Sequence, residues 1–392
     1  MKFLRDFLDK QKPQFGKGGR FEKLHSTFDA FETFLFVPNK TTSSGAHIRD
    51  AIDLKRTMSF VILAMMPALL FGVWNVGYQH FLSLGQSPGF WPMVYYGFGK
   101  VLPIIAVSYI AGLGAEFVFA QIRGHEVNEG YLVSGMLIPL VMPVDIPLWM
   151  VAVACIFAVV IGKETFGGTG MNVFNPALLA RAFVFFAYPA KITGDTIWIG
   201  GLSKPEGVVD AFSGATPLSN AAAGAMEKIP DFYDLFFGFI PGSIGETSKF
   251  AILLGAIVLV VTGIGSWRII VSSLLGGVSM SLIFNLFAAN EYMKIDPMTQ
   301  IMMGSFLFGT VFMATDPVTA SQTTRGKWIY GFLIGFFAIM IRVFNPAYPE
   351  GTMLAILLMN AFAPLIDFYV VEANIKKRLK RALTGVKPLK QN

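Results

Sequence analysis

Ten apolar segments, separated by polar stretches, constrain the fold of this chain more than any other feature of its sequence. A helix needs about 20 apolar residues to cross a bilayer, and fewer where it is broken or re-entrant. Only 14% of the residues are charged, whereas soluble domains carry about 25%. The sequence therefore predicts an all-α integral membrane protein with about ten transmembrane helices, surrounded by the lipid bilayer. The segments form two sets of five, at 57–76, 93–122, 131–142, 147–161 and 176–188 and then at 250–264, 267–287, 301–313, 328–341 and 352–371.

The two sets carry matching sequence marks, which indicate an internal repeat. The pentapeptide VFNPA occurs at 173–177 and again at 343–347, 170 residues later. The third and eighth segments each end in a proline-containing break, around Asp145 and Asp316, 171 residues apart. An odd number of helices per half places the halves in opposite orientations, and broken helices at such an interface often form binding sites. We therefore expect two inverted five-helix repeats with broken helices.

The basic residues lie mainly at the two ends of the chain. Residues 1–56 hold eleven Lys and Arg, the chain from 368 onward holds seven, and 190–248 holds three against seven acids. Positive residues favour the cytoplasmic side, so both termini are predicted to be cytoplasmic, and no nucleic-acid partner is expected. The predicted organisation is a cytoplasmic region (1–56), a first repeat (57–188), a periplasmic loop (189–248), a second repeat (249–371) and a basic cytoplasmic tail (372–392).

Glycine and asparagine gather in the stretch GKETFGGTGMNVFNPALLAR, after the fourth segment. Its glycines let a bound group approach the backbone, and Asn172 and Asn175 offer amide donors and acceptors. Pro176 suits the first turn of a helix. Two interpretations stay open at this point. The stretch forms either a pocket for a planar, hydrogen-bonding ligand or a tightly packed helix junction whose asparagines cap the helices.

Acidic residues in or near the apolar segments are candidates for an ion path, because a carboxylate within hydrocarbon is costly. Without His or Cys partners they suit Na⁺ or H⁺, and no bound metal cofactor is predicted. For Glu116, Glu164 and Asp367, a solvated position at the membrane edge is an equal alternative. The candidates are Glu116, Glu126, Glu129, Glu164, Asp316 and Asp367.

The stretch SGATPLS stands out in the predicted periplasmic loop. Ser213 and Gly214 favour a turn, in which Thr216 would cap a short element or meet water. The small Gly214 and Ala215 also leave the Thr216 hydroxyl accessible, as covalent modification would require. The residues alone do not decide between a surface turn and an acceptor threonine.

At these motifs the chain resembles a known family of bacterial membrane subunits. It comprises the B subunit of sodium-translocating NADH:quinone oxidoreductases and the D subunit of Rnf-type ferredoxin:NAD oxidoreductases. The long N-terminal region before the first segment favours the former. The resemblance implies a urea-transporter-like inverted repeat in the bacterial inner membrane. The matching stretches are HEVNEG, GGTGMNVFNPALLARAF, SGATPLS, GSIGETS, ATDPV, VFNPAYPEG and NAFAPLID.

The resemblance also implies cofactors and partners. In this family the threonine of Ser-Gly-Ala-Thr accepts FMN as a phosphoester, which a separate flavin transferase installs, and Thr216 holds that position. A second, non-covalent flavin, riboflavin, is implied within the subunit, with Asn172 and Asn175 as the candidates to bind it. The remaining implied partners are quinone and the other subunits of a membrane redox complex.

The resemblance implies a redox-driven sodium pump, in which electrons from NADH reach quinone through the flavins. NADH must be oxidised in a partner subunit, because the chain has no nicotinamide motif and only one cysteine. A flavin-free transporter of the same fold, and the Rnf D subunit, are the alternatives. The implied ion-path candidates are Asp29, Glu32, Glu129, Asp316 and Asp367, and the implied quinone-site candidates are Glu126 and Gly130.

Overall fold

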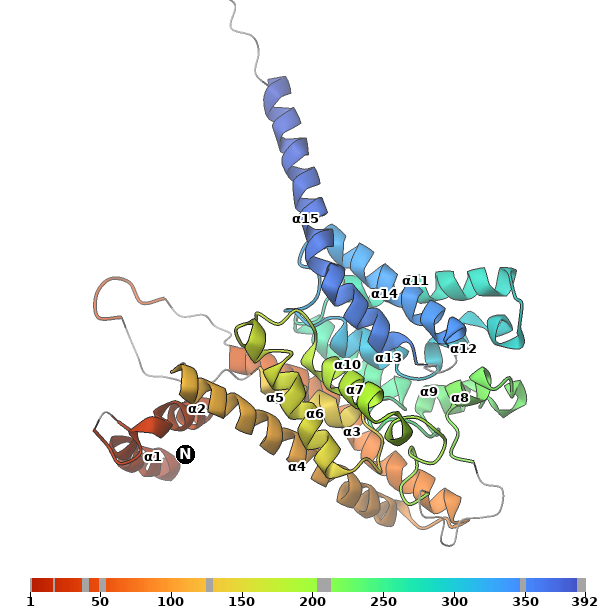
Figure 1. Cartoon of the computed structure of the whole chain (residues 1–392), viewed down its shortest axis with the longest axis horizontal. Coiled ribbons are helices and arrows are strands. Elements are labelled where there is room, and N and C mark those ends of the chain that lie inside the picture. Colours follow the sequence, from red (N-terminus) through yellow and green to blue (C-terminus); the bar gives the residue numbers. More distant parts are fainter. Residues whose placement is uncertain are drawn as a thin grey trace, which may run out of the picture.

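The computed structural model describes residues 2–16, 18–36, 42–48, 54–124, 130–202, 213–345 and 350–385. Every regular element in these ranges is a helix, which confirms the predicted all-α class (Figure 1). Six helical stretches there are long and apolar enough to cross a membrane. The chain is thus a multi-pass membrane protein. The six stretches are Leu54–Ser83, Phe90–Arg123, Leu148–Phe166, Trp267–Leu286, Thr324–Phe344 and Thr352–Ala382.

The helices follow the predicted segments, with different lengths. The first two, α3 (Leu54–Ser83) and α4 (Phe90–Arg123), run beyond the predicted 57–76 and 93–122. In α3 the added residues include polar ones such as Lys55 and Gln79, which hydropathy does not register, whereas α4 gains Phe90, Trp91 and Pro92 at its start. The others in the first half are α5 (Tyr131–Leu140), α6 (Leu148–Val160) and α7 (Pro176–Ala187).

The second half contains a segment that is broken more strongly than the sequence indicated. The predicted eighth segment consists of α12 (Pro297–Met302), the single turn α13 (Phe306–Phe308) and a π-helical turn at Gly309–Met313. Around it stand α10 (Lys249–Val261), α11 (Trp267–Leu286), α14 (Thr324–Phe344) and α15 (Thr352–Gly385). In Figure 1 the C-terminal part of α15 extends beyond the rest of the molecule.

Close helix packing holds each half together. Helix α4 packs along α6 in the first half, α11 packs along α14 in the second, and α3 packs against α10 between the halves. Glycine allows the closest of these approaches: a Cβ at Gly335 would lie 1.8 Å from the Ser273 carbonyl oxygen. Small residues at helix crossings are typical of membrane proteins, where lipid gives helices little hydrophobic reason to associate.

Two buried arginines cap the carbonyl groups that the broken helices leave free. Arg181 of α7 donates to the carbonyl of Val141, directly after α5. Arg342 of α14 donates to the carbonyls of Gln300 and Met303, where α12 ends. Backbone groups at membrane depth need such partners, because no water is available there. The two breaks are therefore stabilised by the same device.

The described residues of the predicted periplasmic loop, 189–202 and 213–248, fold back onto the membrane helices. They form α8 (Pro217–Ala222) and α9 (Phe232–Phe237) and bury Ile199, Leu218 and Ile240. In the N-terminal region, α1 (Lys2–Phe15) and α2 (His25–Leu35) pack together, and α2 contacts α4. Short 3₁₀ turns lie at Glu22–Leu24, Glu164–Phe166, Pro189–Lys191, Met226–Lys228 and Glu291–Lys294.

Candidate functional site

Thr216 is the N-cap of the short helix α8. Its hydroxyl oxygen accepts a hydrogen bond from the Ser219 amide at 3.2 Å, and Pro217 occupies the first helical position. Threonine and proline both favour these positions. Only glycine fits two positions earlier, since a Cβ at Gly214 would lie 2.3 Å from the Asp195 carbonyl oxygen. The capping role that the sequence left open is therefore present, on a side chain that stays partly exposed.

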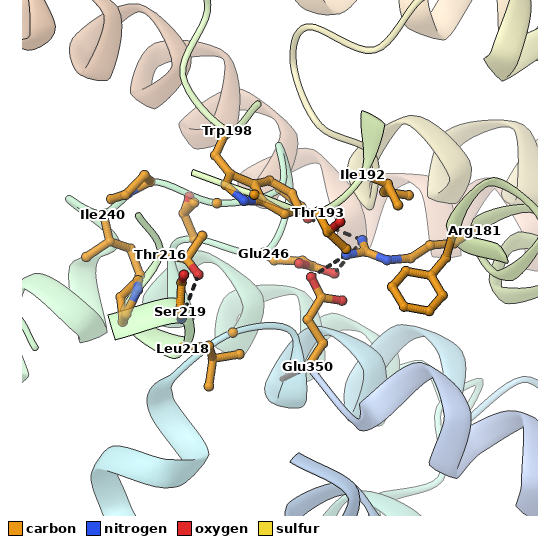
Figure 2. A pocket seen from close by; sticks show the side chains of 18 of the residues that line it. Arg181, Ile192, Thr193, Trp198, Thr216, Leu218, Ser219, Ile240, Glu246 and Glu350 are labelled. Carbon is orange, nitrogen blue, oxygen red and sulfur yellow. Dashed lines mark hydrogen bonds and ion pairs between the residues drawn. The ribbon is translucent and has the colours of Figure 1, made fainter. Parts of the chain in front are cut away.

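A cavity of about 190 Å³ opens beside Thr216. Its wall combines aromatic, cationic and acidic side chains from elements far apart in the sequence. Figure 2 shows Trp198 and Glu246 lying between Thr216 at one end and Arg181 at the other. Among the lining residues are Arg181, Trp198, Thr216, Glu246, Lys249 and Glu350.

Two buried cations face this cavity. The Arg181 guanidinium donates to the Ser243 hydroxyl at 3.2 Å and pairs with the carboxylates of Glu246, at 3.5 Å, and Glu350. The Lys249 ammonium donates to the carbonyl oxygens of Glu246 at 2.8 Å, Thr247 at 3.2 Å and Gly304 at 3.2 Å. Buried charges persist in proteins when they are paired and hydrogen-bonded in this way.

Two further groups of this cavity, the Glu246 carboxyl and the Thr247 hydroxyl, are available to interact with a ligand. Burial raises the pKa of Glu246 to about 7, with Arg181 lowering it and Glu350 raising it further. The Thr247 hydroxyl is buried and lines the cavity, and among the described residues it has no hydrogen-bond partner. Buried polar groups are normally satisfied, so this hydroxyl suits a ligand atom.

A second cavity, of about 90 Å³, brings together four residues that the sequence singled out. Gly130, Asn172, Asn175 and Asp316 all line it, from both halves of the chain. The Thr169 hydroxyl also lines it, and its oxygen is buried without a partner among the described residues. The side chain of Lys163 completes the polar wall.

Asn175 joins the two halves at this cavity. Its side-chain oxygen caps α7 by accepting from the amides of Ala177 at 3.0 Å and Leu178 at 3.3 Å, and its amide nitrogen donates to Asp316 at 3.4 Å. Asp316 also accepts from the Val318 amide at 3.1 Å. Asn175 therefore caps a helix, as one interpretation predicted, and it also lines a cavity.

The glycines before Asn172 adopt a backbone conformation that favours glycine. Gly167, Gly168 and Gly170 have φ values of 117°, 100° and 90°, which residues with a side chain rarely adopt. The turn lets Asn172 donate to the Phe174 carbonyl at 3.1 Å. This local geometry presents both asparagines to the second cavity.

The other predicted ion-path residues lie elsewhere. The Asp367 carboxylate accepts hydrogen bonds from the Ser321 hydroxyl, the Thr323 hydroxyl and the amides of Gln322 and Thr323, at 2.6–2.9 Å. It therefore anchors the turn before α14. Neither Asp367 nor the N-terminal acids lines either cavity within the described residues.

The remaining predicted acids, in the N-terminal helix α2, in α4 and in the turn Glu164–Phe166, have other partners. Glu32 of α2 pairs with Arg5 and Lys12 of α1, at 3.3 and 2.8 Å, and Asp29 accepts from Thr33 through its carbonyl. Glu116 pairs with Lys163, and Glu164 pairs with Arg123 at 3.1 Å. Glu126 and Glu129 lie outside the described residues.

Sequence reasoning missed the cationic side of both cavities. The three cations that lie in or beside apolar segments are Arg181, Lys163 and Lys249. Their positions could have indicated a functional site, because cations within a membrane are as costly as acids. Trp198 and Glu246 carried no such signal. They lie in the predicted loop, and only its folding against the helices brings them to Thr216.

Comparison with known protein families covers most of the chain. A family model described as the NQR2, RnfD, RnfE family matches residues 41–376. The chain belongs to this family. Both cavities lie within the matched region.

Several curated relatives cover nearly the whole chain. The B subunit of the Na⁺-translocating NADH-quinone reductase of Ectopseudomonas mendocina is 47% identical over 411 residues, 96% of this chain and 99% of the relative. The proteins of the same name from Stutzerimonas stutzeri and Chromohalobacter salexigens are 47% identical over 407 residues and 45% over 404. They cover 96% of this chain, and 99% and 96% of their own lengths.

Proposed function

We propose that this chain is the flavin-carrying membrane subunit of a sodium-translocating NADH:quinone reductase. Support comes from membership of the NQR2, RnfD, RnfE family and from relatives that are named as the B subunit of this reductase and match end to end. In this proposal the chain passes electrons from NADH, which a partner subunit oxidises, to quinone. Because the relatives named above are all B subunits of the reductase, we prefer this function to that of an Rnf D subunit.

The observation that carries the proposal is the position of the Thr216 hydroxyl at a cavity with two buried cations. FMN joined to Thr216 as a phosphoester fits the residues present. Lys249 and Arg181 offer positive charge to a phosphate, Thr247 offers an unused hydroxyl, and Trp198 offers a planar face for a ring. The bound flavin would supply reversible electron transfer, while the covalent bond keeps it at high local concentration.

The second cavity is the proposed site of riboflavin. Asn172 and Asn175 are amide groups suited to the edge of a flavin ring, and both line this cavity. Helix α7 links the two sites, since Asn175 caps its start and Arg181 lies six residues later. At 1.5 Å per residue these two positions are roughly 9 Å apart along the helix axis.

The ion and quinone assignments also belong to the proposal. Asp316 is the ion-path residue that we favour, because it is a buried carboxylate at a break between the halves and lines the second cavity. Gly130 lines the same cavity and is proposed for quinone, together with Glu126. Asp29, Glu32, Glu129 and Asp367 remain ion-path proposals that neither cavity supports.

We further propose the ten-helix inverted repeat, with the domain limits predicted above and cytoplasmic termini in the bacterial inner membrane. Matching neighbours support it: α4 packs on α6 as α11 packs on α14, and α6 packs on α7 as α14 packs on α15. The proposed partners are a flavin transferase and the other subunits of the complex.

Peptide mass spectrometry tests the central assignment. The chain is produced with an active flavin transferase, as wild type, as Thr216→Ala and as Thr193→Ala, a threonine of the same cavity. We expect the SGATPLS peptide to gain the mass of FMN less water in the wild type and in Thr193→Ala, and not in Thr216→Ala. An unmodified Thr216 in the wild type would refute the flavin-carrier function and favour a flavin-free transporter.

A further inference from the structure

Asp145 lies in the first break, and the sequence marks it as the counterpart of Asp316. Its surroundings are quite different. One carboxylate oxygen accepts from the Lys100 ammonium at 2.9 Å, and the other accepts from the backbone amide of Gly201 at 2.6 Å. Asp145 lines neither of the two cavities within the described residues. Its carboxylate instead ties α4 to the folded segment 195–202.

His80, at the end of α3, holds the same segment from a second helix. Its Nδ1 atom makes a hydrogen bond of 2.6 Å with the Gly200 carbonyl. The imidazole is stacked on the ring of Tyr96, with centroids 3.8 Å apart and an interplanar angle of 3°. Gly201 has φ of 88°, so its backbone turns in a way that few other residues allow. Asp145 and His80 thus clamp two consecutive residues, which we call the outer clamp.

The opposite side of the clamped segment carries the Thr216 motif. A Cβ at Gly214 would lie 2.7 Å from the Leu202 side chain and 3.4 Å from that of Ile199. The Ser219 hydroxyl donates to the Asp195 carboxylate at 2.9 Å. The indole of Trp198, three residues before Gly201, forms the cavity wall near Thr216 in Figure 2.

These contacts form one continuous connection from the membrane helices to the acceptor threonine. We propose that Asp145 is a positioning residue for the flavin on Thr216, acting through Gly201 to hold the Trp198 wall against the ring. The inference rests on the function proposed above and extends it. Asp145 touches neither the threonine nor the cavity, so its effect is on docking of an attached flavin and not on its attachment.

Loss of the clamp has a measurable consequence. A hydrogen bond to a charged group shifts an equilibrium by about tenfold to a hundredfold. Asp145→Ala therefore lowers, by that factor, the ratio of flavin stacked on the Trp198 wall to flavin released from it. Flavin stacked on an indole fluoresces weakly. Fluorescence per attached flavin therefore rises toward the value of Trp198→Phe, and flavin anisotropy falls.

The experiment uses the full chain, loaded by the flavin transferase and purified in detergent. Mass spectrometry gives the fraction of Thr216 modified, and fluorescence is expressed per modified chain. Asp145→Asn is the conservative variant, because its amide oxygen still accepts from Gly201, and it should restore most of the quenching. Asp296→Ala is the matched control, since Asp296 also caps backbone amides, at 2.9 and 3.2 Å, but in α12.

The outcomes separate the inference from the function on which it rests. A wild type without flavin on Thr216 refutes both. A modified Asp145→Ala whose fluorescence equals wild type, or changes only as much as in Asp296→Ala, overturns the positioning role. If Asp145→Ala does not fold, His80→Phe keeps the stack on Tyr96 and removes the bond to Gly200. It must then raise the fluorescence if the outer clamp acts as proposed.

Discussion

Replacing Glu246 with glutamine tests the electrostatics of the Thr216 cavity while leaving its shape nearly unchanged. Burial raises the pKa of this carboxyl from 4.5 to about 7, against the opposing effect of Arg181. Between these values the folded chain holds a proton on Glu246 that the unfolded chain has released. Stability from this group is therefore fully present below pH 4.5 and is lost as the pH rises through 7.

The rise in pKa sets the size of the effect. One pKa unit corresponds to about 1.4 kcal/mol, so the rise amounts to about 3 kcal/mol between the two limits. The chain is produced without flavin transferase, so that no phosphate enters the cavity. Its apparent melting temperature is then measured in detergent from pH 5 to 7. We expect a fall of roughly 5 °C in the wild type and a flatter profile for Glu246→Gln.

A second variant guards against a general effect of charge removal. Glu227 is exposed in the same loop region, so Glu227→Gln should keep the wild-type pH profile. Parallel profiles for wild type and Glu246→Gln would refute the reasoning, because the proton would then not reside on Glu246.

Three further substitutions test the packing and the second site. Gly326→Ala puts a Cβ 2.1 Å from the Ser321 hydroxyl and 2.6 Å from Asp367, and should lower thermal stability by about 1–3 kcal/mol. Gly114→Ala, with open space around it, should not. Arg342→Met removes the hydrogen-bond donor of two buried carbonyls and should lower the free energy of unfolding by about 2–5 kcal/mol. Thermal unfolding in detergent measures this, and a melting temperature equal to wild type would contradict the capping role. Asn175→Ser keeps a good N-cap but loses the side-chain amide proposed to contact the flavin ring, so the riboflavin extracted per chain should fall while the melting temperature stays close to wild type. Unchanged riboflavin would argue against the second site.

Local features were predictable to the residue where a single stretch contains all the necessary partners. Pro176 begins α7 and Asn175 caps it, as the order Asn-Pro indicates. The breaks after the third and eighth segments were likewise visible as proline in an apolar context.

Side chains that depend on distant partners were less predictable. Asp367 and Asp316 look alike in the sequence, as acids close to apolar segments. The first is surrounded by donors from the turn before α14, whereas the second faces a cavity between the halves. The difference arises from which helix end meets each carboxylate, and no local pattern carries that information.

Membrane residence, helical class and family membership are already contained in the linear order of residues, because apolar runs and short motifs are local properties. The set of side chains that surrounds Thr216 is not determined by the linear order of residues. Arg181, Glu246, Lys249 and Trp198 reach one cavity only because α7, α10 and the folded 189–248 region converge there. Tertiary packing alone could place them together, since helix contacts depend on the shapes of whole surfaces and not on neighbours in the chain.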